Sequence, residues 1–294
     1  MFHVKQLTIS PISNSALKPF LACKDYTVTK EIFTILIDEK TELLITSPRP
    51  DDQSLSKYYE SDNYISHSNS NRSLFDKIYQ IVRNYTIGQK IKLINSFDSE
   101  ERTILDIGAG TGDFLFRCQK DGWKVEGIEP STNARKLAEQ KTGEKLKTQI
   151  SELGTKKYDV ITLWHVLEHV PNLSDYVAQL NHLLKPKGSI VVAVPNHKSF
   201  DASYYGKFWA AYDVPRHLWH FSQIAIQKLF AKENMKVTQT LPMKFDAFYV
   251  SLLSEKYKKG KMNVFNAFNI GLQSNLKAKH TNEYSSLIYI IKKA

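Results

Sequence analysis

Cysteine, glycine and proline are all scarce in this sequence of 294 residues. It contains two cysteines, 12 glycines and 10 prolines. Cys23 and Cys118 lie far apart in no paired spacing, which argues against a disulfide framework and a thiolate metal site. No stretch approaches the roughly 18 consecutive apolar residues of a membrane span, and residues 1–10 lack the apolar run of a secretion signal. We therefore expect a globular protein that stays in the cytoplasm.

Arginine is missing from the most basic part of the chain. The formal net charge is +10, and residues 255–294 hold eight lysines and two glutamates but no arginine. A surface that grips nucleic acid usually mixes arginine with aromatic residues. Scattered lysines instead indicate a solvated basic face. We therefore expect a small-molecule partner, with neither nucleic acid nor a membrane as the target.

Short apolar runs alternate with helical patterns through the middle of the chain. This alternation is typical of a parallel sheet with crossover helices, so the sequence predicts a doubly wound α/β fold. The polar segment 66–73 predicts a boundary between an N-terminal appendage, residues 1–72, and a main domain, residues 73–294. Strands are predicted at 33–37, 42–45, 103–107, 124–128, 145–150, 158–164, 189–194 and 286–291, and helices from near 51 and at 114–120, 132–141 and 173–184.

A glycine-rich turn links the strand at 103–107 to a helix. Gly108, Gly110 and Gly112 let backbone amides approach a ligand closely. The sixth position of a dinucleotide fingerprint is Asp113 instead of glycine, which weakens a nicotinamide or flavin interpretation. Asp106, at the end of the strand, would repel a pyrophosphate and attract an ammonium group. The loop therefore favours an adenosine-bearing ligand that carries an amino acid.

Glu129 follows the next strand, at a place where an acidic side chain can bind both ribose hydroxyls. With this residue, the segment 104–114 (ILDIGAGTGDF) resembles the first motif of class I S-adenosylmethionine-dependent methyltransferases. The segments 127–131 (GIEPS), 158–170 (YDVITLWHVLEHV) and 184–189 (LKPKGS) are similar to later motifs of that family. The resemblance covers residues 100–225. It implies a Rossmann-like, mostly parallel sheet whose last strand is antiparallel.

The resemblance also implies a cofactor, S-adenosylmethionine, with S-adenosylhomocysteine as product. Asp106 would bind its amino group, Glu129 its ribose, and Trp164 and His165 would close over its methionine part. The aspartate that many relatives place near the adenine amine is absent here, where only Ser151 and Glu152 stand. The remaining cofactor contacts implied by the family are Gly108, Ala109, Gly110, Gly112, Pro130, Ser131, Ile150 and Ser151.

Histidines gather in two segments that follow the expected sheet. Methyl transfer is an in-line displacement, in which an enzyme positions the nucleophile and takes the proton of a hydroxyl. His165, His169 and His217 are candidate bases, and Arg216 is a candidate for binding an anionic acceptor group. The alternative is that the histidines cap helices or satisfy buried polar groups. The spacing of His165, Glu168 and His169 also suggests metal ligands, but no further carboxylate cluster completes a site, so no metal is expected.

The N-terminal appendage resembles a small zinc-ribbon head found on certain bacterial methyltransferases. Residues 10–13 and 38–41 stand where its two Cys-x-x-Cys pairs would be, but they contain no cysteine. Since serine and threonine do not replace thiolates on zinc, we expect a degenerate ribbon that folds without metal. The following segment, 57–67, is similar to a lid over the cofactor, with Tyr64 and His67 near it; ordinary core packing is the alternative.

Taken together, these features predict a methyltransferase that acts on a small molecule, with oxygen as the expected acceptor atom. The alternatives are a methyltransferase for tRNA or protein, a non-catalytic cofactor-binding scaffold, and, more weakly, a nicotinamide-dependent oxidoreductase. An insertion at 246–278 interrupts the last strand pair. It is a candidate either for shaping the acceptor pocket or for contact with a second copy of the chain in a homodimer.

Overall fold

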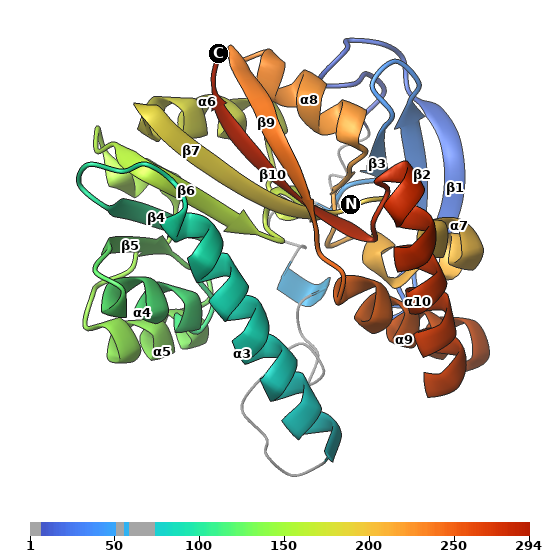
Figure 1. Ribbon diagram of the computed structural model, residues 1–294. Coiled ribbons are helices and arrows are strands. Elements are labelled where there is room, and N and C mark those ends of the chain that lie inside the picture. The colour runs from blue at the N-terminus through green and yellow to red at the C-terminus, as the bar shows by residue number, and fades with distance from the viewer. Residues whose placement is uncertain (1–6, 51–55, 59–73) are drawn as a thin grey trace.

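A six-stranded sheet forms the centre of the molecule (Figure 1). The structure is a computed structural model, and it describes residues 7–50, 56–58 and 74–294. Strand β10 is antiparallel to both of its neighbours, β7 and β9, while the other pairings are parallel. This confirms the predicted Rossmann-like α/β fold with an antiparallel last strand. The sheet order is β5 (Lys124–Ile128), β4 (Thr103–Ile107), β6 (Tyr158–Trp164), β7 (Leu184–Pro195), β10 (Ser286–Lys293) and β9 (Met235–Pro242).

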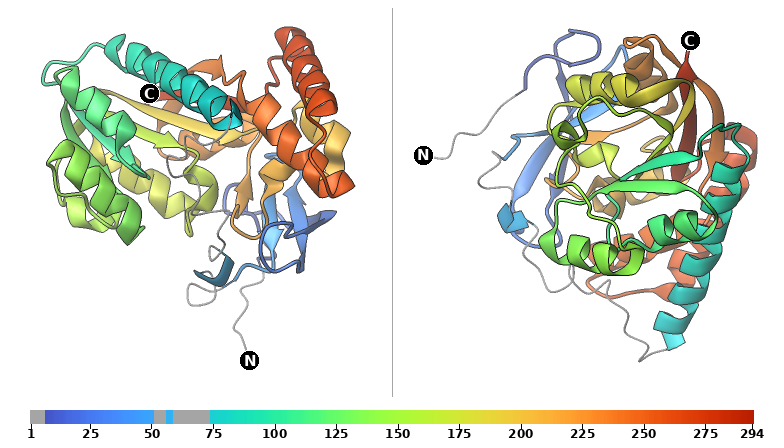
Figure 2. Two further views of the ribbon diagram at one scale, coloured as in Figure 1. Left: turned by 90° about the horizontal axis from the view of Figure 1, so that it is seen from below. Right: turned by 90° about the vertical axis from the view of Figure 1, so that its left-hand side faces the viewer.

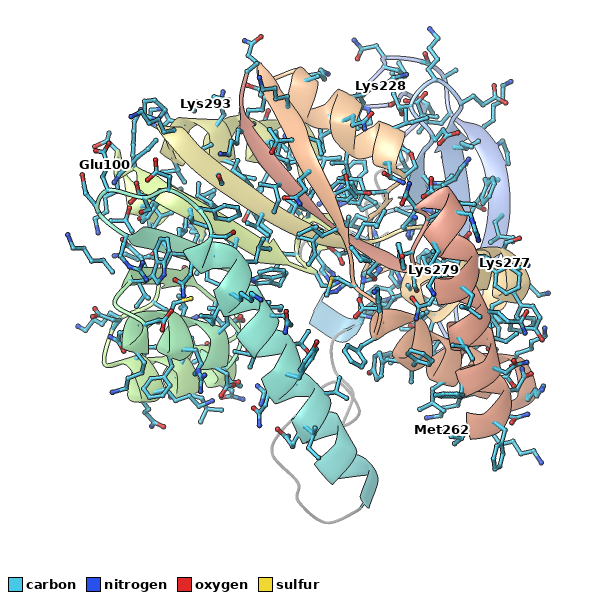
Figure 3. The ribbon with its side chains drawn as sticks, viewed as in Figure 1. Glu100, Lys228, Met262, Lys277, Lys279 and Lys293 are labelled. Atoms are coloured by element: carbon cyan, nitrogen blue, oxygen red, sulfur yellow. The ribbon has the colours of Figure 1, made fainter. Side chains whose placement is uncertain are left out.

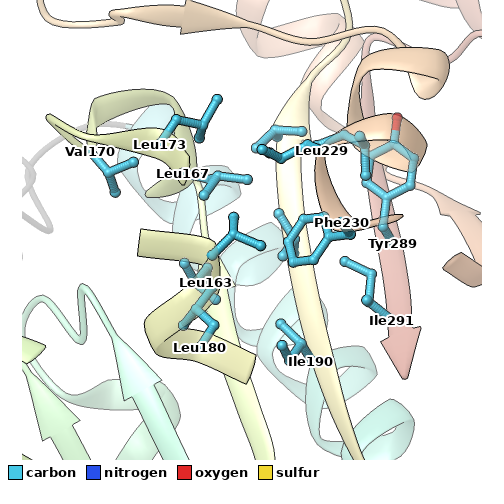
Figure 4. Close-up of a cluster of buried hydrophobic side chains, with 14 of the residues drawn as sticks. Leu163, Leu167, Val170, Leu173, Leu180, Ile190, Leu229, Phe230, Tyr289 and Ile291 are labelled. Carbon is cyan, nitrogen blue, oxygen red and sulfur yellow. The ribbon is translucent and has the colours of Figure 1, made fainter. Parts of the chain in front are cut away.

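Helices cover both faces of this sheet (Figure 2). One face carries α3 (Leu74–Asn95), α4 (Asp113–Lys120) and α5 (Thr132–Thr142). The other carries α6 (Leu173–Leu183) and α8 (Gln223–Ala231). Apolar side chains from both helices and from the sheet interlock on this second face, and burying them is the main favourable term in folding (Figure 4). The labelled members include Leu163, Leu180, Ile190, Leu229 and Phe230.

Two predicted elements differ from the observed ones. The expected strand at 145–150 is only a single bridge, between Lys147 and Ile128, followed by a 3-10 turn, η2 (Ile150–Leu153). The polar residues 185–188 were expected to end a helix before a strand at 189, yet β7 begins at Leu184 and includes them. A register shift between Tyr158 and Val160 on the neighbouring strand lets the ladder accommodate Pro186, which has no amide hydrogen to donate.

A second, smaller sheet joins three N-terminal strands to a two-residue strand from the main domain. Its order is β1 (Lys18–Lys24), β2 (Ile32–Asp38), β3 (Leu43–Ser47) and β8 (Trp219–His220), with all pairings antiparallel. Leu44 and Ile45 of β3 pair with His220 and Trp219 of β8. The N-terminal segment is therefore joined to the main domain by a shared sheet, and is more than a separate appendage.

The four positions that would hold zinc in a ribbon converge on one carboxylate. Ser10 and Ser13 donate hydrogen bonds of 2.6 and 2.7 Å to Oδ2 of Asp38, and the Thr41 hydroxyl donates to the same oxygen. The amide of Lys40 donates to Oδ1 at 3.0 Å. Asp38 is fully buried, and the hydrogen-bond donors outweigh burial and hold the pKa of its carboxyl below the usual range. We call these residues, Ser10, Ser13, Asp38 and Thr41, the hydroxyl cluster.

The expected insertion consists of two helices between β9 and β10. These are α9 (Asp246–Lys259) and α10 (Val264–Thr281). The two helices pack so closely that a Cβ at Gly271 would collide with Phe248. A further short helix, α7 (Phe200–Tyr205), lies against them.

The lysines labelled in Figure 3 lie on three different elements: Lys228 on α8, Lys277 and Lys279 on α10, and Lys293 on β10.

Other expectations concern the membrane and the segment before α3. Within the described ranges, no helix is both long and apolar enough to cross a bilayer. The helix expected near residue 51, and the lid residues Tyr64 and His67, lie outside the described residues.

Candidate active site

The glycine loop lies between the carboxyl ends of β4 and β5. The amides of Gly108 and Ala109 both donate to the carbonyl of Ile128, which ties the loop to β5. A Cβ on Gly108 would lie 2.4 Å from Val166, and one on Gly112 would lie 2.7 Å from Ala138, so both glycines are needed for packing. Gly110 differs, because a Cβ there would meet nothing within 4 Å. Its open side and φ of +55° leave a backbone surface that a ligand can approach.

Glu129, just past β5, faces this loop. Its two carboxylate oxygens accept hydrogen bonds of 2.8 Å, one from the amide of Gly110 and one from the amide of Ser131. The side chain is 9% exposed, and each oxygen keeps a second lone pair for a ligand hydroxyl. Pro130 and Ser131 follow directly, and Ser131 caps the first turn of α5. The structure thus places four of the expected cofactor contacts, Gly110, Glu129, Pro130 and Ser131, close together.

Asp106 lies beneath the loop, on the face of the sheet covered by α3 and α4. It is 2% exposed, and the Thr162 hydroxyl of β6 donates to it at 2.6 Å. Burial raises the pKa of this carboxyl to about 7, although the Thr162 hydrogen bond and the positive charge of Lys90 oppose the shift. Burial also lowers the pKa of the Lys90 ammonium to about 8. An acidic and a basic side chain therefore lie near each other below the glycine loop.

Trp164, at the end of β6, lies on the same side. Lys90 lies 4.1 Å from the centre of its ring, and Phe114 of α4 packs edge-on against it. Ile150 and Ser151, expected near the adenine, lie on η2 just past the bridge to β5. Glu152 caps its own turn, accepting hydrogen bonds from Thr148 and the amide of Gln149.

His165 lies between two carboxylates. Its Nε2 is 3.1 Å from Oδ2 of Asp246, at the start of α9, and its Nδ1 is 3.4 Å from Oε1 of Glu168. Burial disfavours the charge, but these two partners outweigh it and raise the pKa of His165 to about 10. The residue also has a left-handed φ of +58°. Because it is a cation at neutral pH, His165 is a poor general base in this state.

His169 and His217 form an edge-to-face pair with ring centres 4.7 Å apart. His169 follows the turn after β6, whereas His217 comes from the segment before β8. Nδ1 of His169 is 3.0 Å from the carbonyl oxygen of Arg216, and Nδ1 of His217 is 2.8 Å from that of Ala211. Burial lowers the pKa of His169 to about 4, so this ring is neutral. One ligand atom from each of Glu168, His169 and His217 lies within 4.8 Å of the others.

Arg216 has a different environment from the one expected. It is 1% exposed, and its guanidinium donates to Asp25 and Asp213 and to the carbonyl of Tyr58. Such a buried side chain, which donates four hydrogen bonds, joins the N-terminal sheet to the main domain. His220 is also buried, paired with the Thr46 hydroxyl at 3.0 Å, and burial holds its pKa far below the usual value. His220 thus pairs with a buried polar group, which is the alternative role that the sequence left open for the histidines.

Two residues of the site, Lys90 and Asp246, were missed by sequence analysis. Lys90 lies on α3, between the lid-like segment 57–67 and the first methyltransferase motif at 104–114, and Asp246 lies 81 positions after His165 in the insertion. Neither stands in a local pattern that separates it from an ordinary surface charge. Only the packing of α3 and α9 against the carboxyl edge of the sheet brings them to the site.

The fold and the site together define a class I S-adenosylmethionine-dependent methyltransferase. Residues 79–240, more than half of the chain, match the methyltransferase domain family, so the chain belongs to it. In structure it is similar to magnesium protoporphyrin IX methyltransferase from Synechocystis PCC 6803 with bound S-adenosylhomocysteine, with a TM-score of 0.55 and 15% identity over 83% of this chain and 100% of that one. At this identity the similarity shows the fold.

Two relatives share more of the sequence over a shorter length. Ubiquinone biosynthesis O-methyltransferase of Rickettsia bellii (strain OSU 85-389) is 32% identical over 143 residues, which is 45% of this chain and 59% of that protein. The enzyme of the same name from Photobacterium profundum is 32% identical over 108 residues, 33% of this chain and 46% of that protein. The chain thus matches about half the length of these curated relatives.

Proposed function

We propose that this protein transfers the methyl group of S-adenosylmethionine to a hydroxyl oxygen of a small molecule. The observation that carries the proposal is the alignment of two sites along one sheet edge, with the glycine loop, Glu129 and Asp106 at the ends of β4 and β5 and the histidine pair after β6. The names of the relatives, which are O-methyltransferases, support oxygen as the acceptor atom.

The residues of the first site suit the two polar ends of the cofactor. The open face of Gly110 admits the ligand, and Glu129 would accept hydrogen bonds from the ribose hydroxyls. Asp106 and Lys90 would pair with the ammonium and carboxylate of the methionine part, because each offers the opposite charge when it is ionised. The cofactor supplies the activated methyl group, and these residues hold and orient it.

The acceptor hydroxyl has to lose its proton before or during the transfer. The oxygen then attacks the methyl carbon, the bond from carbon to sulfur breaks, and its electron pair remains on sulfur. His165 is held as a cation by Asp246 and Glu168. We therefore assign activation of the hydroxyl to the adjacent group of Glu168, His169 and His217.

Calorimetric titration with S-adenosylmethionine and S-adenosylhomocysteine tests the cofactor part. A hydrogen bond to a charged group contributes about 1.5–3 kcal/mol, so Glu129→Gln should weaken binding roughly 10-fold or more. Glu126→Gln is the matched control, because Glu126 lies on β5 but binds Lys156 and Tyr158 instead. Equal affinities for the two variants would contradict the assignment of Glu129.

The acceptor part is tested by turnover with a panel of phenols, catechols and hydroxy acids. We expect His217→Ala to lose methyl transfer while it keeps its affinity for S-adenosylmethionine. Detection of a methylated carbon or nitrogen product, with no methyl ether, would overturn the oxygen assignment.

A further inference from the structure

Helix α10 exposes its large apolar side chains and buries mostly small ones. Its buried positions are Ala267, Ile270, Gly271, Ser274 and Ala278. The large apolar side chains exposed on the helix are those of Val264, Phe265, Phe268, Leu272 and Leu276. A surface helix normally has the opposite arrangement, with its large apolar residues facing the core. A contiguous set of exposed apolar residues of this kind marks an interaction surface.

These exposed residues follow one face of the helix. Phe265, Phe268, Leu272 and Leu276 succeed one another at intervals of three or four positions, which places them on the same side. Phe265 is 91% exposed and Phe268 is 60% exposed. At a rise of about 1.5 Å per residue, the distance along the helix from Phe265 to Leu276 is about 17 Å. We call Val264, Phe265, Phe268, Leu272 and Leu276 the α10 stripe.

The charges exposed around the α10 stripe are all positive. Between residues 244 and 282, every exposed side chain that is charged at neutral pH is a lysine, and there are seven of them. The two acidic residues of this range are less accessible. Glu255 is fully buried and pairs with Lys259 at 3.0 Å, and Asp246 is half-buried beside His165. The surface of the two-helix insertion is therefore both apolar and cationic.

Lysines lie at both ends of the stripe. Lys261 comes just before α10, next to the exposed Met262, and Figure 3 shows Met262 at one end of the helix and Lys277 and Lys279 toward the other. Lys279 follows Leu276 by three positions and so lies on the same face. Aromatic and aliphatic side chains with lysines at their margins are typical of a helix that lies in the plane of a membrane interface.

The inner face of α10 is fixed to the rest of the molecule. A Cβ on Gly271 would lie 2.7 Å from an atom of the Phe248 side chain, so α9 and α10 are in close contact. The buried hydroxyl of Ser274 donates to Oδ1 of Asp201, on α7, at 2.6 Å. These contacts hold α10 in one orientation, with the stripe facing outward. The stripe is thus a preformed surface that does not need to fold on binding.

We propose that the α10 stripe and the lysines around it dock this protein on the surface of an anionic lipid bilayer. The apolar side chains enter the boundary between the headgroups and the acyl chains, and the lysines face the acidic headgroups. The sequence analysis expected a solvated basic face, because the lysines are scattered along the chain. The fold places them around an exposed apolar stripe, which favours a lipid surface as the partner.

A second copy of the chain is the other partner that an exposed apolar helix could take. In a two-fold contact the same surface meets itself, so the lysines of one copy would face the lysines of the other. No exposed carboxylate between residues 244 and 282 is available to pair with them. Like charges brought together at an interface oppose association. The charge pattern therefore favours an anionic bilayer over a dimer formed through this face.

Co-sedimentation with lipid vesicles tests the proposal. The full chain is mixed with vesicles of equal parts phosphatidylglycerol and phosphatidylcholine, or of phosphatidylcholine alone. We expect binding to the mixed vesicles that weakens as salt is added, and binding at least about 10-fold weaker to phosphatidylcholine alone. Phe265→Ser should weaken binding to the mixed vesicles about 10-fold, because a large apolar side chain no longer leaves water.

Matched variants away from the insertion control for general effects. Leu137→Ser also removes an exposed apolar side chain, but from α5, which Figure 1 shows on the opposite side of the molecule from α10. Lys261→Glu combined with Lys279→Glu tests the charges.

The control for the charge variant is Lys136→Glu combined with Lys145→Glu, which changes the net charge equally at two exposed lysines on and just after α5. We expect the pair beside the stripe to lose binding about 10-fold or more, and the pair near α5 to retain most of it.

Circular dichroism shows whether each variant is folded, and light scattering after gel filtration gives its oligomeric state. Vesicle binding that depends on Phe265 and on the two lysines beside the stripe upholds the proposal. It is overturned if the wild-type chain does not bind the mixed vesicles, or if folded Phe265→Ser binds them as tightly as Leu137→Ser does. It is also overturned if the wild-type chain is a dimer that Phe265→Ser converts to a monomer, which would assign this face to a second copy.

Discussion

At the scale of single residues, the hydroxyl cluster holds residues 10–13 and 38–41 together through one carboxylate. Asp38 carries one negative charge, and Ser10, Ser13 and Thr41 turn their hydroxyl hydrogens toward it. In a zinc ribbon a central cation binds thiolates, whereas here a central carboxylate accepts hydrogen bonds from hydroxyl groups. The positions follow from the sequence, because residues 10–13 and 38–41 keep the spacing of the two pairs. The inward role of Asp38 needed the fold to reveal it.

Asp38→Asn should lower the free energy of unfolding by about 1–3 kcal/mol at pH 7, because buried Ser10 and Thr41 lose a charged acceptor. Urea denaturation measures the loss, and Ser13→Ala, which removes one half-buried donor, should cost less. The pKa of Asp38 is lowered by folding, so its contribution is present above pH 4 and disappears as the pH falls below that value. The difference in stability between the two proteins should therefore shrink as the pH falls below about 4. A difference that stays constant with pH would contradict this account.

At the scale of helices and strands, β4, β5, β6 and the helices α4, α5 and α6 were predicted to within a residue, whereas α3 and β9 were not predicted. Residues 103–107 and 158–164 are mostly buried runs of strand length, while 124–128 is buried only at its last two residues, and the observed bounds of all three match the prediction. The segment at 145–150 was not predictable, because only Lys147 reaches β5 and the chain then turns into η2. Local sequence does not specify over how many residues a segment can pair with a neighbouring strand.

Gly110 and Gly143 offer a matched pair for testing the loop. Both have a positive φ, +55° and +72°, and a Cβ on either would meet nothing within 4 Å. Alanine in this conformation costs about 1–2 kcal/mol at each position. Gly110→Ala should in addition weaken binding of S-adenosylmethionine 10-fold or more, because the new methyl group stands where the ligand approaches, whereas Gly143→Ala at the end of α5 should not. Calorimetry on both variants checks this, and unchanged affinity in Gly110→Ala would place the cofactor elsewhere.

At the scale of the whole molecule, the two parts of the chain are interwoven. The sequence predicted a boundary at residue 72, but β8 completes the N-terminal sheet and Arg216 bonds to Asp25, 191 positions earlier. A pairing over such a distance leaves no local signal, because β8 is a two-residue strand in a segment dense with aromatic and charged residues. The same interweaving places His217, which makes the site dependent on the N-terminal sheet.

Arg216→Met should destabilise the whole chain by about 3–5 kcal/mol, because Asp25 and Asp213 would keep buried charge without a partner. Scanning calorimetry should show one cooperative transition for both wild type and variant, at a lower temperature in the variant. Arg117→Met is the control, since Arg117 is exposed on α4. Two separate transitions, or equal stability of the two variants, would show that the sheets unfold independently.

The hydroxyl cluster also determines how the protein responds to its chemical surroundings. A zinc ribbon held together by thiolate ligands loses its fold when zinc is scarce or when peroxide oxidises the sulfur atoms. A head closed by three hydroxyls and a carboxylate has no sulfur at those positions to oxidise and no ion to lose. Metal starvation and oxidative stress should therefore leave the N-terminal sheet folded, with His217 still in place.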